Sequence, residues 1–306
     1  MPNVKQHGFF LILFPVFFLA TLSACSVYEE ESYFEPVKTD TYLLDGYQGK
    51  TDFVLGGDYA LSPSDINFID DLSSFDGNSK EDISAVFVGN INEIANRRII
   101  LYLHDRFGNI DTYWQRIKLL ANLGTNDYGI LAIDYRGYGK STGTTTELSM
   151  TFDTGAAIDW LQAQGVDGTN LILYGYGLGS VPAIDVMVTP RSLIPAKVIL
   201  EAPIASMELL LQDALYQSIP VEYLTHLSFD NIGKISSVTQ PLHWIHGTED
   251  NIYPLSHGQR LYDKHSGFKT KNIVENANHF NLPQSINLEP NNFQQYLLLL
   301  RIFIES

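Results

Sequence analysis

From about Asp52 to the C-terminus the chain alternates between short apolar runs and longer amphipathic stretches, and this alternation constrains the fold most strongly. Buried strands separated by helices imply a mostly parallel sheet with helices on both faces, so the sequence predicts one α/β domain. The predicted strands are 66–70, 83–88, 98–104, 128–135, 170–176, 197–200, 241–246 and 272–275. The predicted helices are 111–123, 154–164, 178–188, 206–218, 257–265 and 292–305.

Two segments depart from this simple alternation. The first two predicted strands flank the turn signal Asp76-Gly77-Asn78, which favours an antiparallel hairpin at the start of the sheet. Between Pro203 and Gln240, the predicted helix 206–218 is followed by a loose, Tyr-rich stretch. We interpret this segment as a small cap over the sheet edge.

The composition is that of a globular protein with an acidic surface. The chain has 306 residues, of which 45% are hydrophobic and 18% are charged, and its net charge is −16. A surface of that charge repels phosphate backbones, so we expect no nucleic-acid partner. The sequence contains neither a zinc-type Cys/His pattern nor a phosphate-binding loop, so we also expect no metal and no cofactor.

The N-terminus is predicted to be a lipoprotein export signal. Lys5 precedes the apolar run Phe9–Ala20, which is short for a bilayer span and is interrupted by Pro15. The next segment, LSAC at residues 22–25, resembles the bacterial lipobox, whose cysteine is lipidated and becomes the new N-terminus. Cys25 is the single cysteine of the chain, so we expect a lipid attachment point there. The alternative is an ordinary signal peptide with a chance cysteine.

The segment after the lipobox is interpreted as a tether. It sustains no periodicity and it is acidic, with Glu29, Glu30, Glu31 and Glu35. The predicted organisation is therefore a signal peptide at 1–24, a lipid anchor and acidic tether at 25–50, and a folded domain at 51–306. We expect the protein to be exported and held at a membrane of a bacterial cell envelope. Ser26 is not the aspartate that retains many lipoproteins in an inner membrane, so an outer membrane is preferred.

Polar motifs follow most of the predicted strands, at the edge where parallel sheets bind their ligands. In chain order they are LYLHDRFGNI at 101–110, DYRGYGKSTG at 134–143, LYGYGLGS at 173–180, FDNIGKIS at 229–236, HGTEDNIYPLSHG at 246–258 and ENANHF at 275–280. Together these segments resemble the serine-hydrolase branch of the α/β-hydrolase fold. The resemblance is strongest to its membrane-associated, depalmitoylase- and serine-peptidase-like members, and it implies an α/β-hydrolase fold for this chain.

The segment GYGLG at 175–179 resembles the nucleophile elbow of that family, in which a strained turn lifts a serine to the top of the sheet. In this chain the serine position is Gly177. A glycine offers no side-chain oxygen, so no acyl-enzyme can form there. Ser180, one helical turn farther on, and Ser141 in the DYRGYGKS motif are the weaker alternatives for a relocated nucleophile.

The resemblance places the other two triad positions at Asp250 and His279. Asp250 follows the predicted strand 241–246, His279 follows the last predicted strand, and the order of elbow, acid and base is that of the fold. We therefore expect the two side chains to lie within hydrogen-bonding reach, with the acid orienting the imidazole toward the elbow. The alternative interpretation is a turn residue and a polar loop residue.

The loop implied to supply the oxyanion hole also departs from the family, which commonly has glycine after the histidine of this strand. Here His104 is followed by Asp105 and Arg106. A carboxylate at Asp105 opposes the negative charge that an oxyanion hole stabilises, unless Arg106 neutralises it. The other implied donor is the backbone amide of Leu178, directly after the elbow.

Three functions are compatible with these residues. The first is a pseudoenzyme that binds an acyl, peptide or glycan-like ligand without turning it over. The second is a weak ester, thioester or amide hydrolase in which Asp250 and His279 activate a water in the space left by the missing serine. The third is a structural envelope lipoprotein. We favour the first by a narrow margin, and we expect the turn to tolerate Gly177→Ser, with the new hydroxyl facing His279.

The lipobox predicts that the mature chain begins at a lipidated Cys25. Mass spectrometry of the mature N-terminal peptide should find an acylated cysteine, and Cys25→Ser should move the protein from the membrane fraction to the soluble fraction. An unmodified cysteine, or cleavage at another residue, would contradict this prediction.

Overall fold

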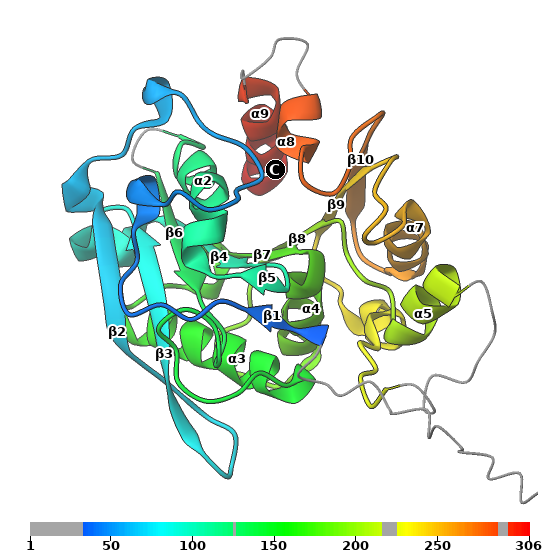
Figure 1. Ribbon diagram of the computed structural model, residues 1–306, viewed down its shortest axis with the longest axis horizontal. Helices are drawn as coiled ribbons and strands as arrows, with labels where there is room; N and C mark the ends of the chain where they lie inside the picture. The colour runs from blue at the N-terminus through cyan, green and yellow to red at the C-terminus, as the bar shows by residue number, and fades with distance from the viewer. Residues whose placement is uncertain (1–32, 125–126, 216–224, 287–292) are drawn as a thin grey trace, which may run out of the picture.

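An eight-stranded sheet organises the computed structural model, which describes residues 33–124, 127–215, 225–286 and 293–306 (Figure 1). The strand order is β10-β9-β8-β7-β4-β6-β3-β2, and neighbouring strands from β10 to β6 are parallel. β3 is antiparallel to both of its neighbours, so the predicted hairpin and the mostly parallel sheet are confirmed. The strands are β2 (Ile66–Phe75), β3 (Lys80–Val88), β4 (Arg98–Leu103), β6 (Tyr128–Ile133), β7 (Leu171–Tyr176), β8 (Lys197–Glu201), β9 (Leu242–Gly247) and β10 (Lys269–Val274).

Helices cover both faces of this sheet, as the burial of its strands requires. In β4, Leu101 and Leu103 belong to one buried core, whereas Ile100 and Tyr102 belong to the other. The central strands are continuous apolar runs because successive side chains alternate between these two cores. The first core is covered by α3 (Glu147–Ala163), α4 (Ser180–Val188) and α7 (Leu255–Lys264), and the second by α2 (Ile110–Ala121) and α9 (Gln294–Glu305) (Figure 1).

Helix α3 begins at Glu147, two turns before the predicted start at Thr154. Thr146 and Ser149 form a capping box, in which each side-chain oxygen accepts a hydrogen bond from the backbone N–H of the other residue. A polar cap, rather than apolar periodicity, marks this end of the helix. The periodicity used for the prediction therefore detected only the second half of α3.

The predicted cap between Pro203 and Gln240 is described in part. It contains α5 (Met207–Leu215), which lies inside the predicted helix 206–218, and the short α6 (Asn231–Lys234). Leu227 and Phe229 are buried in the first core, so this part of the segment packs on the domain. Residues 216–224, which include much of the Tyr-rich stretch, lie outside the described residues.

The prediction of a tether is wrong for residues 33–50, which fold against the domain. β1 (Glu35–Pro36) pairs in parallel with β5 (Phe107–Gly108), close to the end of β4 (Figure 1). Phe34 and Tyr42 are buried, and Phe34 is only 3% exposed. The folded domain therefore includes residues 33–50, and the predicted boundary at residue 51 does not mark its start.

Polar contacts hold the same segment in place. The Tyr42 hydroxyl donates a hydrogen bond of 2.6 Å to Asp134, and the backbone N–H groups of Leu43 and Leu44 donate to Asp111 at 2.9 Å and 2.7 Å. The acidic composition of this segment favoured a solvated tether in the sequence analysis, although part of the segment is buried. Two aromatic side chains supply its buried surface, and isolated aromatic residues produce no periodic signal.

The remaining N-terminal predictions concern residues 1–32, which lie outside the described ranges. The signal peptide at 1–24, Cys25 and the start of the tether all belong to residues 1–32. Within the described ranges, no helix combines the length and the apolar character that a membrane crossing requires.

Phe34→Ala should lower the free energy of unfolding by about 3 kcal/mol, because it removes a buried aromatic side chain and leaves a cavity. Leu43→Ala is the matched control in the same segment. Its side chain is 57% exposed, so the change should stay within about 0.5 kcal/mol. Urea unfolding followed by circular dichroism measures both values, and a negligible effect of Phe34→Ala would restore the tether interpretation.

Candidate active site

The predicted nucleophile elbow lies where β7 ends and the chain turns into α4 through the short turn Gly177–Gly179. Gly177 has a φ of +53°, a left-handed conformation that other residues adopt only with strain. Gly179 is packed so closely that a Cβ atom there would lie 2.0 Å from the carbonyl oxygen of Leu103. The turn therefore has the backbone of a nucleophile elbow, and the residue at its apex is a buried glycine.

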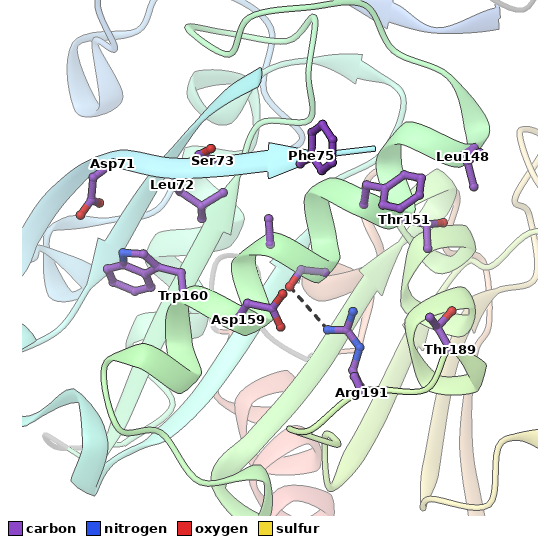
Figure 2. Close-up of a pocket in the computed structure, with 13 residues that line it drawn as sticks. Asp71, Leu72, Ser73, Phe75, Leu148, Thr151, Asp159, Trp160, Thr189 and Arg191 are labelled. Atoms are coloured by element: carbon purple, nitrogen blue, oxygen red, sulfur yellow. Dashed lines mark hydrogen bonds between the residues drawn. The ribbon is translucent and has the colours of Figure 1, made fainter. Parts of the chain in front are cut away.

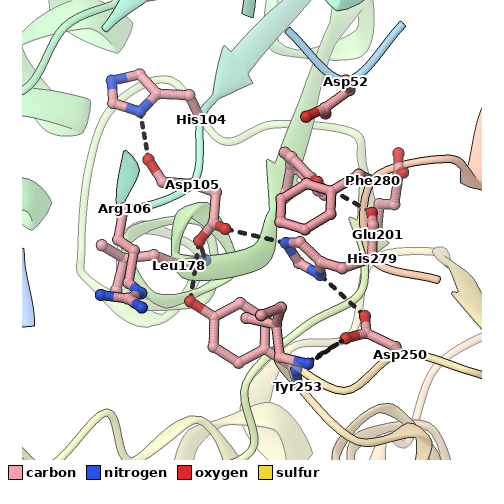
Figure 3. A network of polar contacts seen from close by, with 12 residues as sticks. Asp52, His104, Asp105, Arg106, Leu178, Glu201, Asp250, Tyr253, His279 and Phe280 are labelled. Atoms are coloured by element: carbon pink, nitrogen blue, oxygen red, sulfur yellow. Dashed lines mark hydrogen bonds and ion pairs between the residues drawn. The ribbon is translucent and has the colours of Figure 1, made fainter. Parts of the chain in front are cut away.

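Asp250 and His279 lie together in the turns that follow β9 and β10 (Figure 3). His279 Nδ1 donates a hydrogen bond of 2.9 Å to Asp250 Oδ2, which confirms that the two side chains are within hydrogen-bonding reach. The other oxygen of Asp250 accepts from the backbone N–H groups of Ile252 and Tyr253, each at 2.9 Å. The acid is fixed by its own turn, and it fixes the orientation of the imidazole.

The second ring nitrogen of His279 faces Asp105 (Figure 3). His279 Nε2 donates to Asp105 Oδ2 over 3.0 Å, and both side chains are 1% exposed. Asp105 Oδ1 accepts hydrogen bonds from the backbone N–H of Leu178 at 2.7 Å and from the hydroxyl of Tyr253 at 3.0 Å. The carboxylate thus accepts hydrogen bonds from two groups that the family resemblance assigns to catalysis. One is the Leu178 amide, which would bind the oxyanion, and the other is His279 Nε2, which would face the nucleophile.

The Asp105 side chain occupies the volume that a side chain at Gly177 would need. A Cβ atom at Gly177 would lie 2.4 Å from both the Cγ and the Oδ1 atoms of Asp105, far inside contact distance. The expectation that the turn alone tolerates Gly177→Ser is therefore wrong, because a serine and this carboxylate require the same volume. The space left by the missing serine is filled by Asp105, where the sequence suggested room for a water.

Arg106 forms its ion pair with Glu35 and not with Asp105, so the neutralisation that the sequence left open is not observed. Its guanidinium donates to the carbonyl oxygen of Tyr33 at 3.0 Å and forms an ion pair with Glu35 at 2.5 Å. The guanidinium carbon also lies 5.0 Å from the centroid of the Tyr33 ring. Figure 3 shows the side chain directed away from the Asp105 carboxylate, whose ion-pair partner is His279.

The protonation of the network follows from its burial and its contacts. Burial alone would lower the pKa of His279, but hydrogen bonds to Asp105 and Asp250 and the charges of both carboxylates raise it to about 9. Burial alone would raise the carboxyl pKa values. Hydrogen bonds from His279, and at Asp250 also from His246, outweigh burial and hold the pKa of both acids below the usual range. At neutral pH an imidazolium therefore lies between two carboxylates, and an imidazolium accepts no proton.

Two tyrosines that the motifs do not single out complete the site. Tyr176 stacks on the imidazole of His279, with centroids 4.9 Å apart and an interplanar angle of 18°. Tyr253 meets the same ring edge-on at 5.1 Å. Tyr176 lies inside the elbow motif and Tyr253 follows Asp250 by three residues, so nearness to motif residues was the one available signal.

The alternative nucleophiles are committed to structural hydrogen bonds. Ser180 Oγ accepts a bond of 3.1 Å from the backbone N–H of Ile204, and Ser141 Oγ donates to the carbonyl oxygen of Asp134 at 2.6 Å. Both ring nitrogens of His279 are bonded to carboxylates. Neither serine therefore has this base as a partner.

The acid–base groups are not arranged as a metal centre. Asp105 and Asp250 bind different nitrogens of His279, so their oxygens lie on different sides of the ring. Throughout the described ranges, no group of three or more histidine, cysteine or acidic side chains is placed to hold a metal ion.

Comparison with known proteins shows what the chain resembles. No family model matches it. Alpha/beta hydrolase domain-containing protein 17C of Xenopus tropicalis is 34% identical over 214 residues, which cover 69% of this chain and 62% of the relative. The human protein of the same name is 33% identical over 214 residues, which cover 69% of this chain and 59% of the relative. The match therefore spans less than two thirds of the length of these relatives.

Solved structures share the fold at low sequence identity. An esterase from Pyrococcus furiosus has a TM-score of 0.60 at 17% identity, covering 85% of this chain and 98% of the esterase. An esterase from Exiguobacterium antarcticum has a TM-score of 0.56 at 16% identity, covering 78% of this chain and 99% of the esterase. The chain has the α/β-hydrolase fold that its motifs predicted, and the hydrolase-domain relatives support its resemblance to that superfamily.

The raised pKa of His279 should make the fold less stable at alkaline pH. The stabilisation is complete below about pH 6.5, where the unfolded histidine is also protonated, and it is lost as the pH rises through about 9. The difference between the two pKa values corresponds to about 3 kcal/mol. Urea unfolding between pH 6 and 10 measures the decline.

Asp105→Asn should bring the pKa of His279 down toward 7 in an NMR titration and should flatten that decline, because one of the two carboxylate charges is removed. Asp263→Asn, on the exposed side of α7, is the matched control and should change neither quantity. An unaltered His279 pKa in Asp105→Asn would show that the two groups are not coupled.

Proposed function

We propose that this protein is a catalytically inactive member of the α/β-hydrolase superfamily. It acts at a bacterial membrane as a lipid-anchored binding or scaffolding protein for an acyl- or peptide-like ligand. The observation that carries the proposal is the position of Asp105, which binds the Leu178 amide at 2.7 Å and His279 Nε2 at 3.0 Å. A serine hydrolase needs these groups for the oxyanion and for the nucleophile.

Acyl transfer requires a nucleophile, a general base and an oxyanion hole, and in this structure each of the three positions is unsuited to its role. Nucleophilic attack requires a side-chain oxygen, and Gly177 has none. General-base catalysis requires a neutral imidazole with an available nitrogen, whereas His279 has a pKa of about 9 and both of its nitrogens bind carboxylates. Oxyanion stabilisation requires donors directed at developing charge, whereas Leu178 already donates to an anion. Restoring one group alone is therefore insufficient.

The same contacts argue against the weak water-activating hydrolase. That mechanism requires His279 to take a proton from a water beside Nε2, and Asp105 holds this position. Deprotonating His279 would leave the buried carboxylate of Asp105 without its counter-ion, which is costly in a site that is almost fully buried. A binding role requires neither step.

The membrane part of the proposal rests on the lipobox-like sequence at Cys25. Tyr33 follows Cys25 by eight residues. Such a segment spans at most about 29 Å when fully extended. Tyr33 contacts Arg106 in the loop that carries Asp105, so a lipidated Cys25 would hold this face of the domain near the bilayer.

Covalent labelling with a fluorophosphonate tests the proposal. The unaltered protein should not react, and neither should Gly177→Ser, because the new Cβ atom meets the Asp105 carboxylate. The double variant Gly177→Ser/Asp105→Gly should label at least about 100-fold faster than Gly177→Ser, since it frees both the imidazole and one oxyanion donor.

The matched control is Asp105→Gly alone, which opens the same space without adding a hydroxyl and should stay unlabelled. Peptide mapping assigns any label to its residue. Rapid labelling of the unaltered protein at Ser180 or Ser141 would refute the inactive assignment. Equal labelling of Gly177→Ser with and without Asp105 would refute the blocking role of this carboxylate.

A further inference from the structure

A cavity of about 580 Å³ lies between the edge strand β2 and helix α3, where none of Asp105, His279 and Asp250 lines it (Figure 2). Volumes of this size are usual for small-molecule sites. Most of its wall is apolar, from Leu72, Phe75, Leu148, Phe152, Ala156 and Trp160. Phe75 and Leu148 are 63% and 64% exposed, so large apolar side chains also form its rim.

Arg191 supplies a cation at this cavity and is poorly satisfied there. Among the described residues, its guanidinium makes one long hydrogen bond, 3.5 Å from Nη1 to the carbonyl oxygen of Gly155 (Figure 2). Its Nε atom is buried and meets no acceptor in the part of the chain that the structure describes. Burial lowers the pKa of Arg191, although the nearby charge of Asp159 opposes this. A half-buried guanidinium with unused donors is a ready partner for a bidentate carboxylate.

The absence of a side chain at Gly155 leaves room for the guanidinium of Arg191 against α3. A Cβ atom at Gly155 would lie 2.8 Å from Nη2 of Arg191, so the guanidinium rests against the backbone of α3. The indole nitrogen of Trp160, on the same helix, is a second buried donor with no acceptor among the described residues. The unused donors of Arg191 require an acceptor, and the oxygens of a carboxylate provide it.

The surrounding charge restricts which anions can bind. Asp71 and Asp159 also line the cavity, and the chain carries a net charge of −16. A small free anion is repelled by this field and gains little from one exposed contact. An anion with an apolar chain gains in addition from burial against the aromatic and aliphatic wall.

We propose that this cavity binds a single-chain amphiphile with a carboxylate head, such as a medium-chain fatty acid. The carboxylate binds the guanidinium of Arg191, and the chain lies between α3 and β2 toward Phe75 and Leu148. This site is separate from the Asp105–His279 network, so the inference does not depend on whether that network is inactive.

Photolabelling of the full-length protein tests the proposal. The probes are decanoate and decanol, each with a diazirine at the chain end, and peptide mass spectrometry locates the label. The carboxylate probe should label the peptides that contain Phe75 and residues 148–160, and excess unlabelled decanoate should compete.

Arg191→Gln should reduce labelling of these cavity peptides by the decanoate probe at least tenfold and by the decanol probe less than twofold. Arg260→Gln, an exposed arginine on α7, is the matched control and should change neither. Phe75→Ser, at the exposed rim, should reduce labelling by both probes and should leave the circular dichroism spectrum unchanged. Labelling that decanoate does not compete, equal labelling by both probes, or an undiminished signal in Arg191→Gln would overturn the proposal.

Discussion

The ion pair between Asp105 and His279 is the contact on which the site depends. Both side chains are almost fully buried, and buried charges persist only when they are paired and hydrogen-bonded. Removing His279 would leave two carboxylates without a counter-ion, and breaking a buried pair in this way typically destabilises a fold by about 3–5 kcal/mol, whereas removing Asp105 would leave His279 paired with Asp250. The pair therefore constrains its neighbours: Gly177 must lack a side chain, and Asp250 must hold the second ring nitrogen. The triad geometry is kept here as a charge network.

The loop that carries Asp105 also joins this network to the N-terminal segment. Arg106, the next residue, binds the backbone of Tyr33 and the side chain of Glu35. β5 follows directly and pairs with β1, so adjacent residues of one loop contact His279 and the first described residues of the chain. Under the proposed lipid anchor, the membrane attachment and the charge network therefore converge on the same short loop.

The agreement between the predicted and observed elements has a physical pattern. Strands such as β4, β6 and β7 were predicted closely because burial on both faces leaves a long apolar run in the sequence. The start of α3 and the strands β1 and β5 were missed. A capping box and two-residue strands carry no periodic signal, and the partners of β1 lie far away in the chain.

The sequence by itself determined the α/β architecture, the glycine at position 177 of the elbow-like turn and the acid–base pair, because periodicity and local motifs encode all three. Only the tertiary structure decided which side chain occupies the space beside Gly177. Asp105 contacts Leu178, Tyr253 and His279 across 73, 148 and 174 residues of chain. These groups meet because the sheet order brings the ends of β4, β7, β9 and β10 to one edge, and no local pattern records which side chain then fills the shared space.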